Sequence, residues 1–94
     1  MIIAVDYDET LIIKGKANEK LISMLKRNQA MGSHIILNTC RHGKKLKEAL
    51  DFCAGKGLRF SAVNENLPSV VKRFGYNPRK IYADIYIDDK AVKP

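Results

Sequence analysis

Residues 1–11 read MIIAVDYDETL, and this stretch decides the fold that we predict. A continuous apolar run ends in an acid at residue 6, which is typical of a strand buried on both faces of a sheet. Three acids then fall within four positions, at Asp6, Asp8 and Glu9. Because like charges disfavour each other's ionisation, this cluster is either a solvated turn or the binding site of a cation.

The rest of the chain alternates further strands with helices. Three more strands are predicted, at 34–39 (HIILNT), 59–63 (RFSAV) and 83–88 (ADIYID). Helical patterns begin after Asn18, run through 44–57, and begin again at Pro68. This alternation implies parallel strands, whose ligands bind beyond the carboxyl ends. We therefore expect one crevice to be lined by the polar residues that follow three strands: Asp6, Asp8, Thr39, Asp88 and Asp89.

These residue types suit phosphoryl chemistry. Asp6 and Asp8 are two positions apart, so an extended backbone would point both carboxylates to one side. One could attack phosphorus and form an aspartyl phosphate, while the other serves as general acid and base. Mg²⁺ would neutralise the crowded acids together with the phosphate. The hydroxyl of Thr39 and a lysine would hold the phosphoryl oxygens.

The sequence resembles the haloacid dehalogenase-like superfamily, and particularly its small capless phosphatases. DYDETL (6–11) is similar to the DxDx[TV] signature, HIILNT to the strand ending in Thr or Ser, and IYIDDKA (85–91) to the strand ending in paired acids. The resemblance covers nearly the whole chain. It implies that Asp6 is the nucleophile and Asp8 the general acid/base. Asp6, the backbone carbonyl of Asp8, and Asp88 would bind Mg²⁺, with Asp89 close by. An acid two positions after the nucleophile distinguishes phosphatases from dehalogenases and ion-pumping ATPases.

We accordingly predict an α/β fold, a Rossmann-like three-layer α/β/α arrangement of one domain over residues 1–94. In the order of the four predicted strands, the small parallel sheet would run 3-2-1-4. Neither 10–18 nor 40–68 holds an insertion long enough for a cap domain. An open site of this kind accepts large substrates or is closed by a neighbouring subunit.

The basic residue that binds the phosphate has three candidates. Lys80, just before the fourth strand, best fits the family's spacing, with Lys72 second and Arg79 third. Arg41, which follows Thr39 by two positions, is a further candidate for contact with the substrate.

Two departures from the family pattern carry expectations of their own. Many relatives have Gly where this chain has Glu9, so Glu9 predicts a turn with ordinary dihedral angles. Only five residues follow Asp89, so one flank of the fourth strand is expected to be exposed or covered by another subunit, as in a homo-oligomer. Cys40, beside Thr39, is expected to be a buried structural thiol.

Composition and charge limit the classes of partner that we expect. The 94 residues carry 17 basic and 10 acidic side chains, a net charge of +7, which favours anionic ligands. No apolar run approaches the roughly 20 residues of a membrane span, and two cysteines without a CxxC pair fit a reduced, cytoplasmic protein. A Mg²⁺-dependent phosphatase of phosphorylated small molecules is the favoured hypothesis. The alternatives are a nucleic-acid end phosphatase, which no run of aromatic residues supports, and an inactive metal- or phosphate-binding module.

Overall fold

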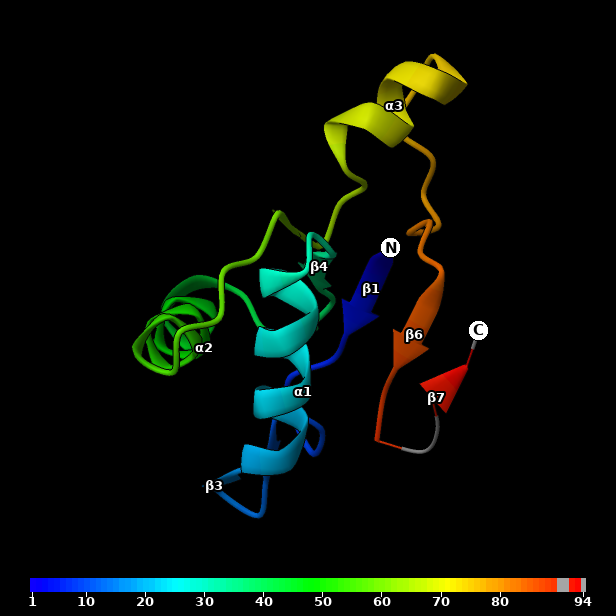
Figure 1. The fold of residues 1–94 in the computed structure, drawn as a ribbon. Helices are drawn as coiled ribbons and strands as arrows, with labels where there is room; N and C mark the ends of the chain where they lie inside the picture. The colour runs from blue at the N-terminus through cyan, green and yellow to red at the C-terminus, as the bar shows by residue number, and fades with distance from the viewer. Residues whose placement is uncertain (90–91, 94) are drawn as a thin grey trace.

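The computed structural model describes residues 1–89 and 92–93 (Figure 1). Strands and helices alternate through most of the chain, as the sequence predicts. In order they are β1 (Ile2–Val5), β2 (Ile12–Ile13), β3 (Lys16–Ala17), α1 (Glu19–Ala30), β4 (His34–Leu37), α2 (Gly43–Gly55), β5 (Ala62–Val63), α3 (Pro68–Phe74), β6 (Ile85–Ile87) and β7 (Val92–Lys93). Among the described residues, none of the helices is both long and apolar enough to cross a membrane.

The main sheet has the strand order β5-β4-β1-β6-β7, and its first four strands are parallel. This confirms the predicted order 3-2-1-4 of the four principal strands. The expectation of an exposed flank on the fourth strand is wrong, because β7 pairs with β6 in antiparallel register, Tyr86 opposite Lys93. The flank of β6 that faces away from β1 is thus covered by Val92–Lys93.

Register brings the ends of three strands to one level. Val5 of β1 lies opposite both Leu37 of β4 and Ile87 of β6. The ladder continues one step further, since the amide of Asp6 donates to the carbonyl of Ile87 at 2.9 Å. The polar residues that follow the strands therefore start from the same edge of the sheet.

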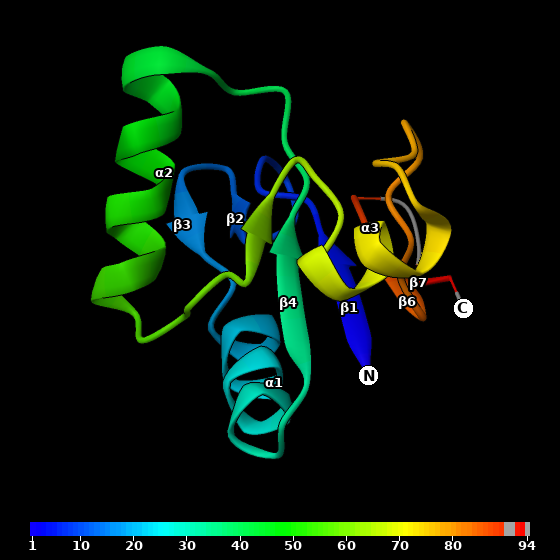
Figure 2. The same ribbon diagram turned by 90° about the horizontal axis from the view of Figure 1, so that it is seen from above.

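Helices cover both faces of the sheet (Figures 1 and 2). One face packs against α1 and α2 in a core that includes Val5, Leu25, Leu37 and Cys53. The opposite face packs against α3 in a smaller core, whose buried members are Ala4, Ile36, Ala62, Leu67 and Val70. Alternate residues of β1 and β4 thus enter different cores, as the strand period of two requires.

Local signals explain the helix boundaries. The side chain of Asn18 caps α1 by accepting a hydrogen bond from the amide of Leu21 at 3.3 Å, as predicted. Pro68 opens α3, where its missing N–H is not needed. Gly75 ends α3 in the left-handed conformation, at φ 79°.

Candidate active site

A cavity of about 300 Å³ lies at the carboxyl edge of the sheet, beyond β1, β4 and β6. Asp6, Thr39 and Asp88 line it, each following a different strand. Its remaining walls come from Ala4, Asn38, Cys40, Tyr86 and Ile87. The structure therefore brings together the predicted nucleophile, the predicted phosphate-binding hydroxyl and one predicted metal ligand.

Asp6 is half-buried in the lining of this cavity. Its Oδ1 accepts a hydrogen bond from the amide of Tyr7 at 2.8 Å. Burial raises the pKa of Asp6, and the neighbouring Asp8, Asp89 and Asp88 raise the pKa further, against the opposing effect of the Tyr7 amide. The site thus holds an excess of negative charge that a cation would relieve.

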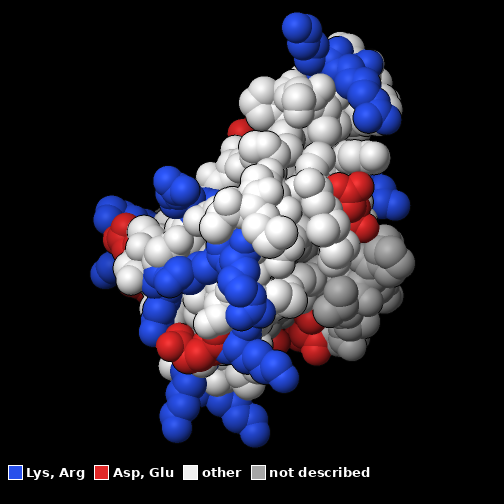
Figure 3. All heavy atoms as spheres, viewed as in Figure 1, with Lys and Arg blue, Asp and Glu red and all other residues white. Residues whose placement is uncertain are grey.

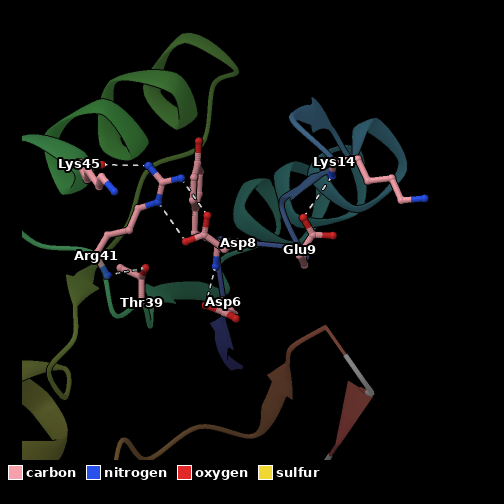
Figure 4. Close-up of polar contacts among 8 residues, drawn as sticks. Asp6, Asp8, Glu9, Lys14, Thr39, Arg41 and Lys45 are labelled. Carbon is pink, nitrogen blue, oxygen red and sulfur yellow. Dashed lines mark hydrogen bonds and ion pairs between the residues drawn. The ribbon is translucent and has the colours of Figure 1, made fainter.

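The side chain of Asp8 points in a different direction from that of Asp6. The strand ends at Val5, and the amides of Thr10 and Leu11 both bond to the carbonyl of Tyr7. The chain therefore turns before the alternation of side chains can reach residue 8. The expectation that the Asp6 and Asp8 carboxylates point to one side is not met (Figure 4). Asp8 lines a second cavity, of about 640 Å³, which shares Cys40 with the first.

Arg41 holds Asp8 in a bidentate ion pair (Figure 4). Its Nε and Nη2 donate to the two carboxylate oxygens at 3.0 and 2.8 Å. The same guanidinium lies 4.7 Å from the centre of the Tyr7 ring, and Nη1 donates to the carbonyl of Lys45 at 3.3 Å. Hydrogen bonding to Arg41 lowers the pKa of Asp8. Sequence analysis selected Arg41 as a substrate contact, but nothing in the sequence indicated this pairing.

Thr39 is fixed by two hydrogen bonds. Its amide donates to Oδ1 of Asn64 at 2.7 Å, and its hydroxyl accepts from the amide of Arg41 at 3.1 Å. Asn64 follows β5 and has a φ of 56°, a left-handed conformation that Asn tolerates better than most residues. Sequence analysis overlooked Asn64, although an Asn just after a strand is a usual sign of such a turn.

Glu9 does not have ordinary dihedral angles, so that expectation is wrong. Its φ of 56° is left-handed, the conformation that glycine adopts at no steric cost. A residue with a Cβ therefore occupies a strained position in this turn. A hydrogen bond partly offsets the strain, since the carboxylate of Glu9 accepts from the amide of Lys14 at 3.2 Å (Figure 4).

The lysine candidates lie apart from this cluster. Lys80 lines another cavity, beside Tyr76 and Tyr82, and its carbonyl accepts from the side chain of Asn66 at 3.1 Å. Lys72 is in the last turn of α3. The described residues that line the 300 Å³ cavity include neither of them, nor Arg79. A phosphate-binding role for any of the three stays a prediction.

Two further side chains at the site need comment. Cys40 is exposed rather than buried, so the expectation of a structural thiol there is wrong; it lines both cavities. Cys53 is the buried thiol, and burial raises its pKa to about 11. Asp89 is exposed and lies near enough to raise the pKa of Asp6.

The carboxylates at this site suit Mg²⁺ better than a metal ion that needs three or more protein side chains as ligands. Within the described part of the chain, no group of three or more His, Cys, Asp or Glu side chains is arranged to hold a metal ion. Mg²⁺, however, commonly takes one or two carboxylates and completes its shell with water and substrate phosphate. Asp6 and Asp88, which line one cavity, supply such carboxylates, so the residues present fit this ion.

Comparison with solved structures identifies a relative of this chain. No family model and no curated protein matches the chain. A solved structure described as that of a conserved protein from Bacteroides thetaiotaomicron superposes with a TM-score of 0.81 at 34% sequence identity, covering 97% of this chain and 77% of the other. Similarity of this extent goes beyond a shared fold. The chain belongs to the same family as this conserved Bacteroides thetaiotaomicron protein.

Proposed function

We propose that the protein is a Mg²⁺-dependent phosphomonoester hydrolase of the haloacid dehalogenase-like type, with a Rossmann-like three-layer fold and no cap. One observation carries the proposal: Asp6, Thr39 and Asp88 follow three different strands and line one cavity. The resemblance of the three strand-end motifs to those of the superfamily supports it independently of the cavity.

Asp6 is the nucleophile in this proposal. Its carboxylate oxygen attacks phosphorus, the bond from phosphorus to the leaving oxygen breaks, and the phosphoryl group is held on Asp6. Water then attacks phosphorus and releases inorganic phosphate, which restores the carboxylate. Thr39 is held by Asn64 and by the Arg41 amide, so its position beside the phosphoryl group is set before substrate binds.

Asp6, the backbone carbonyl of Asp8, and Asp88 would hold Mg²⁺, with Asp89 near them. The ion would neutralise charge on the acids and on the phosphoryl oxygens.

Asp8 is the general acid/base, and Arg41 controls its availability. An acid must carry a proton to give it to the leaving oxygen, yet the ion pair with Arg41 favours the ionised carboxylate. A phosphate group bound near Arg41 competes with Asp8 for the guanidinium. Substrate would thereby release Asp8 for proton transfer, while Arg41 contacts the phosphate.

The test is phosphate release from p-nitrophenyl phosphate, with and without Mg²⁺. We expect activity that requires Mg²⁺ in the wild type and is lost in Asp6→Asn. Asp51→Asn is the matched control, because Asp51 is an exposed acid paired with Lys47 on α2. Failure of the folded wild type to release phosphate from this ester and from a panel of phosphomonoesters would contradict the proposal. Retained binding of Mg²⁺ or phosphate would then favour an inactive binding module.

A further inference from the structure

A third cavity, of about 380 Å³, lies on the α3 side of the sheet and is rich in aromatic residues. Three of its aromatic residues are exposed: Tyr76 is 64% exposed, Phe74 44% and Tyr82 37%. Phe74 and Tyr82 are in edge contact, with ring centres 6.2 Å apart. We call this feature the aromatic groove, and its walls are Phe74, Tyr76, Pro78, Lys80, Ile81, Tyr82, Ala83 and Tyr86. Nothing in the proposed phosphatase chemistry uses these rings.

The aromatic groove adjoins the cavity that contains Asp6. Tyr86 lines both hollows. Its hydroxyl donates to the carbonyl of Ile81 and accepts from the amide of Ala83, so the ring is fixed between them. Asp88 lies two residues after Tyr86, and Asp6 two after Ala4; all four line the Asp6 cavity. A long ligand could therefore extend from the groove past Tyr86 to Asp6.

Basic side chains accompany the rings. The guanidinium of Arg73 lies over both Phe74 and Tyr82, at 5.5 and 5.6 Å from the ring centres. Lys80 lines the groove itself. Figure 3 shows basic side chains gathered at the end of the molecule that α3 and the following loop form. Positive charge beside exposed rings is the combination that single-stranded nucleic acids require, since phosphates need cations and bases need flat apolar surfaces.

The loop that carries the rings is fixed by Asn66, which is buried. Its amide nitrogen donates to the carbonyls of Pro78 and Lys80, and its oxygen accepts from the amide of Tyr82 at 2.6 Å. The exposed aromatic side chains therefore stand on an ordered backbone. Ordering a surface before binding lowers the entropic cost of binding.

We propose that the aromatic groove binds single-stranded nucleic acid and presents a terminal phosphate to Asp6. Bases stack on Tyr76 and Tyr82, and Arg73 and Lys80 neutralise backbone phosphates. The presentation of the phosphate rests on the proposed function, whereas binding by the groove does not. The reaction would consume one water and break the bond between phosphorus and the ester oxygen of the terminal nucleotide. Its products would be a nucleic acid with a free terminal hydroxyl and inorganic phosphate. An acidic peptide would satisfy the basic residues but would leave the exposed rings without a purpose.

Binding is tested without any catalysis. The probe is a fluorescein-labelled single-stranded 12-mer of mixed sequence with no terminal phosphate, and the readout is fluorescence anisotropy at 50 and 200 mM salt. We expect the wild type to bind the probe, and affinity to fall as salt rises. Tyr76→Ala should weaken binding about 5- to 150-fold, the effect of removing one base–aromatic stack. Arg73→Gln should weaken binding and reduce the dependence on salt.

Lys47→Gln is the control for charge, because Lys47 is an exposed lysine on α2, a helix that packs on the other face of the sheet. It should leave binding close to that of the wild type. Heparin, a polyanion without bases, is the control for stacking. The proposal is overturned if the wild type does not bind the 12-mer. It is equally overturned if Tyr76→Ala has no effect, or if Lys47→Gln weakens binding as much as Arg73→Gln does.

A second measurement links the groove to the site. We expect Tyr76→Ala to lower kcat/KM for a 12-mer with a terminal phosphate more than kcat/KM for p-nitrophenyl phosphate. Binding without phosphatase activity would support the groove and contradict the proposed function. Activity on small esters without binding of the 12-mer would contradict the groove alone. The two proposals therefore fail separately.

Discussion

Arg41 shows how one side chain can change the role open to another. Residues 8 and 41 are 33 positions apart, and the turn after β1 and the loop before α2 bring them together. The sequence identified both as site residues from local motifs, but it contained no signal that they form an ion pair. Pairing of this kind depends on where the Tyr7–Leu11 turn directs Asp8, which three-dimensional packing decides.

Replacing Arg41 with Gln should change the pH dependence of catalysis. Arg41 lowers the pKa of Asp8, so its removal raises that pKa. A general acid works while protonated, and a higher pKa keeps Asp8 protonated to higher pH. We therefore expect the alkaline limb of kcat/KM against pH to move to higher pH in Arg41→Gln, beside a lower maximum from weaker phosphate contact. An unmoved limb would mean that Asp8 is not the titrating acid; Lys47→Gln controls for the loss of one positive charge.

Glu9 allows the strain of the turn to be measured. Its left-handed φ of 56° costs a residue with a Cβ about 1–2 kcal/mol, and glycine avoids that cost. Glu9→Gly and Glu9→Ala both lose the hydrogen bond to the Lys14 amide, but only Gly relieves the strain. We expect the free energy of unfolding, from urea denaturation, to be about 1 kcal/mol higher for Glu9→Gly than for Glu9→Ala. Equal stabilities would show that the turn adapts to a side chain without strain.

Long apolar segments were predictable, whereas the two-residue strands β2, β3 and β7 were not; β5, equally short, was found because it lies in a longer apolar stretch, 59–63. The runs at 1–6 and 34–39 reveal β1 and β4 because their residues are buried on both faces and need no periodicity to be recognised. β2 and β3 form a two-residue hairpin, and β7 is equally short. The sequence around these three strands contains no apolar run or alternation to detect, so they are found only through the strand that pairs with each of them.

The loop between α3 and β6 is held in place by one residue, Asn66, that was not predicted to have a role. Asn66 follows β5 by three positions and is only 3% exposed. Its side chain replaces regular secondary structure by bonding to the backbone of a segment 12 to 16 residues away. An Asn in a loop usually serves its own turn, so no local pattern distinguished this one.

Asn66→Ala should therefore destabilise the protein and loosen this loop. The substitution leaves the Tyr82 amide and the Pro78 and Lys80 carbonyls without their side-chain partner, and each of these groups that water does not reach costs about 1–3 kcal/mol. We expect a loss of about 2–4 kcal/mol in the free energy of unfolding, measured by urea denaturation. Fast hydrogen exchange at the Tyr82 amide should accompany it. Asn28→Ala is a matched control, since the Asn28 side chain bonds to the Met24 carbonyl of its own helix. Similar losses for both variants would contradict this role of Asn66.

The two faces of the sheet have unequal cores. Among the residues whose burial the structure describes (1–89), the core under α1 and α2 has twelve buried members, and that under α3 has five. Burial of apolar area is the main favourable contribution to folding, so most of the stability should come from the larger side. The aromatic groove belongs to the smaller side, and the Asp6 cavity lies where the two meet at the sheet edge. The periodicity of the sequence predicted the helices, but it did not predict how unequal the cores on the two faces of the sheet would be.

Leu25→Ala and Val70→Ala test this division. Leu25, in α1, is fully buried in the larger core, and its truncation should cost about 2–5 kcal/mol of a total of about 5–15. Val70, in α3, is 5% exposed in the smaller core, and its truncation should cost about 2 kcal/mol.

Native-state hydrogen exchange separates the effects of the two substitutions. Leu25→Ala should reduce protection throughout the sheet, because the whole molecule unfolds more readily. Val70→Ala should reduce protection mainly at α3 and at the amide of Tyr82, through local opening. A uniform loss in Val70→Ala would mean that α3 unfolds only with the rest of the protein, and the groove would then be as rigid as the catalytic edge.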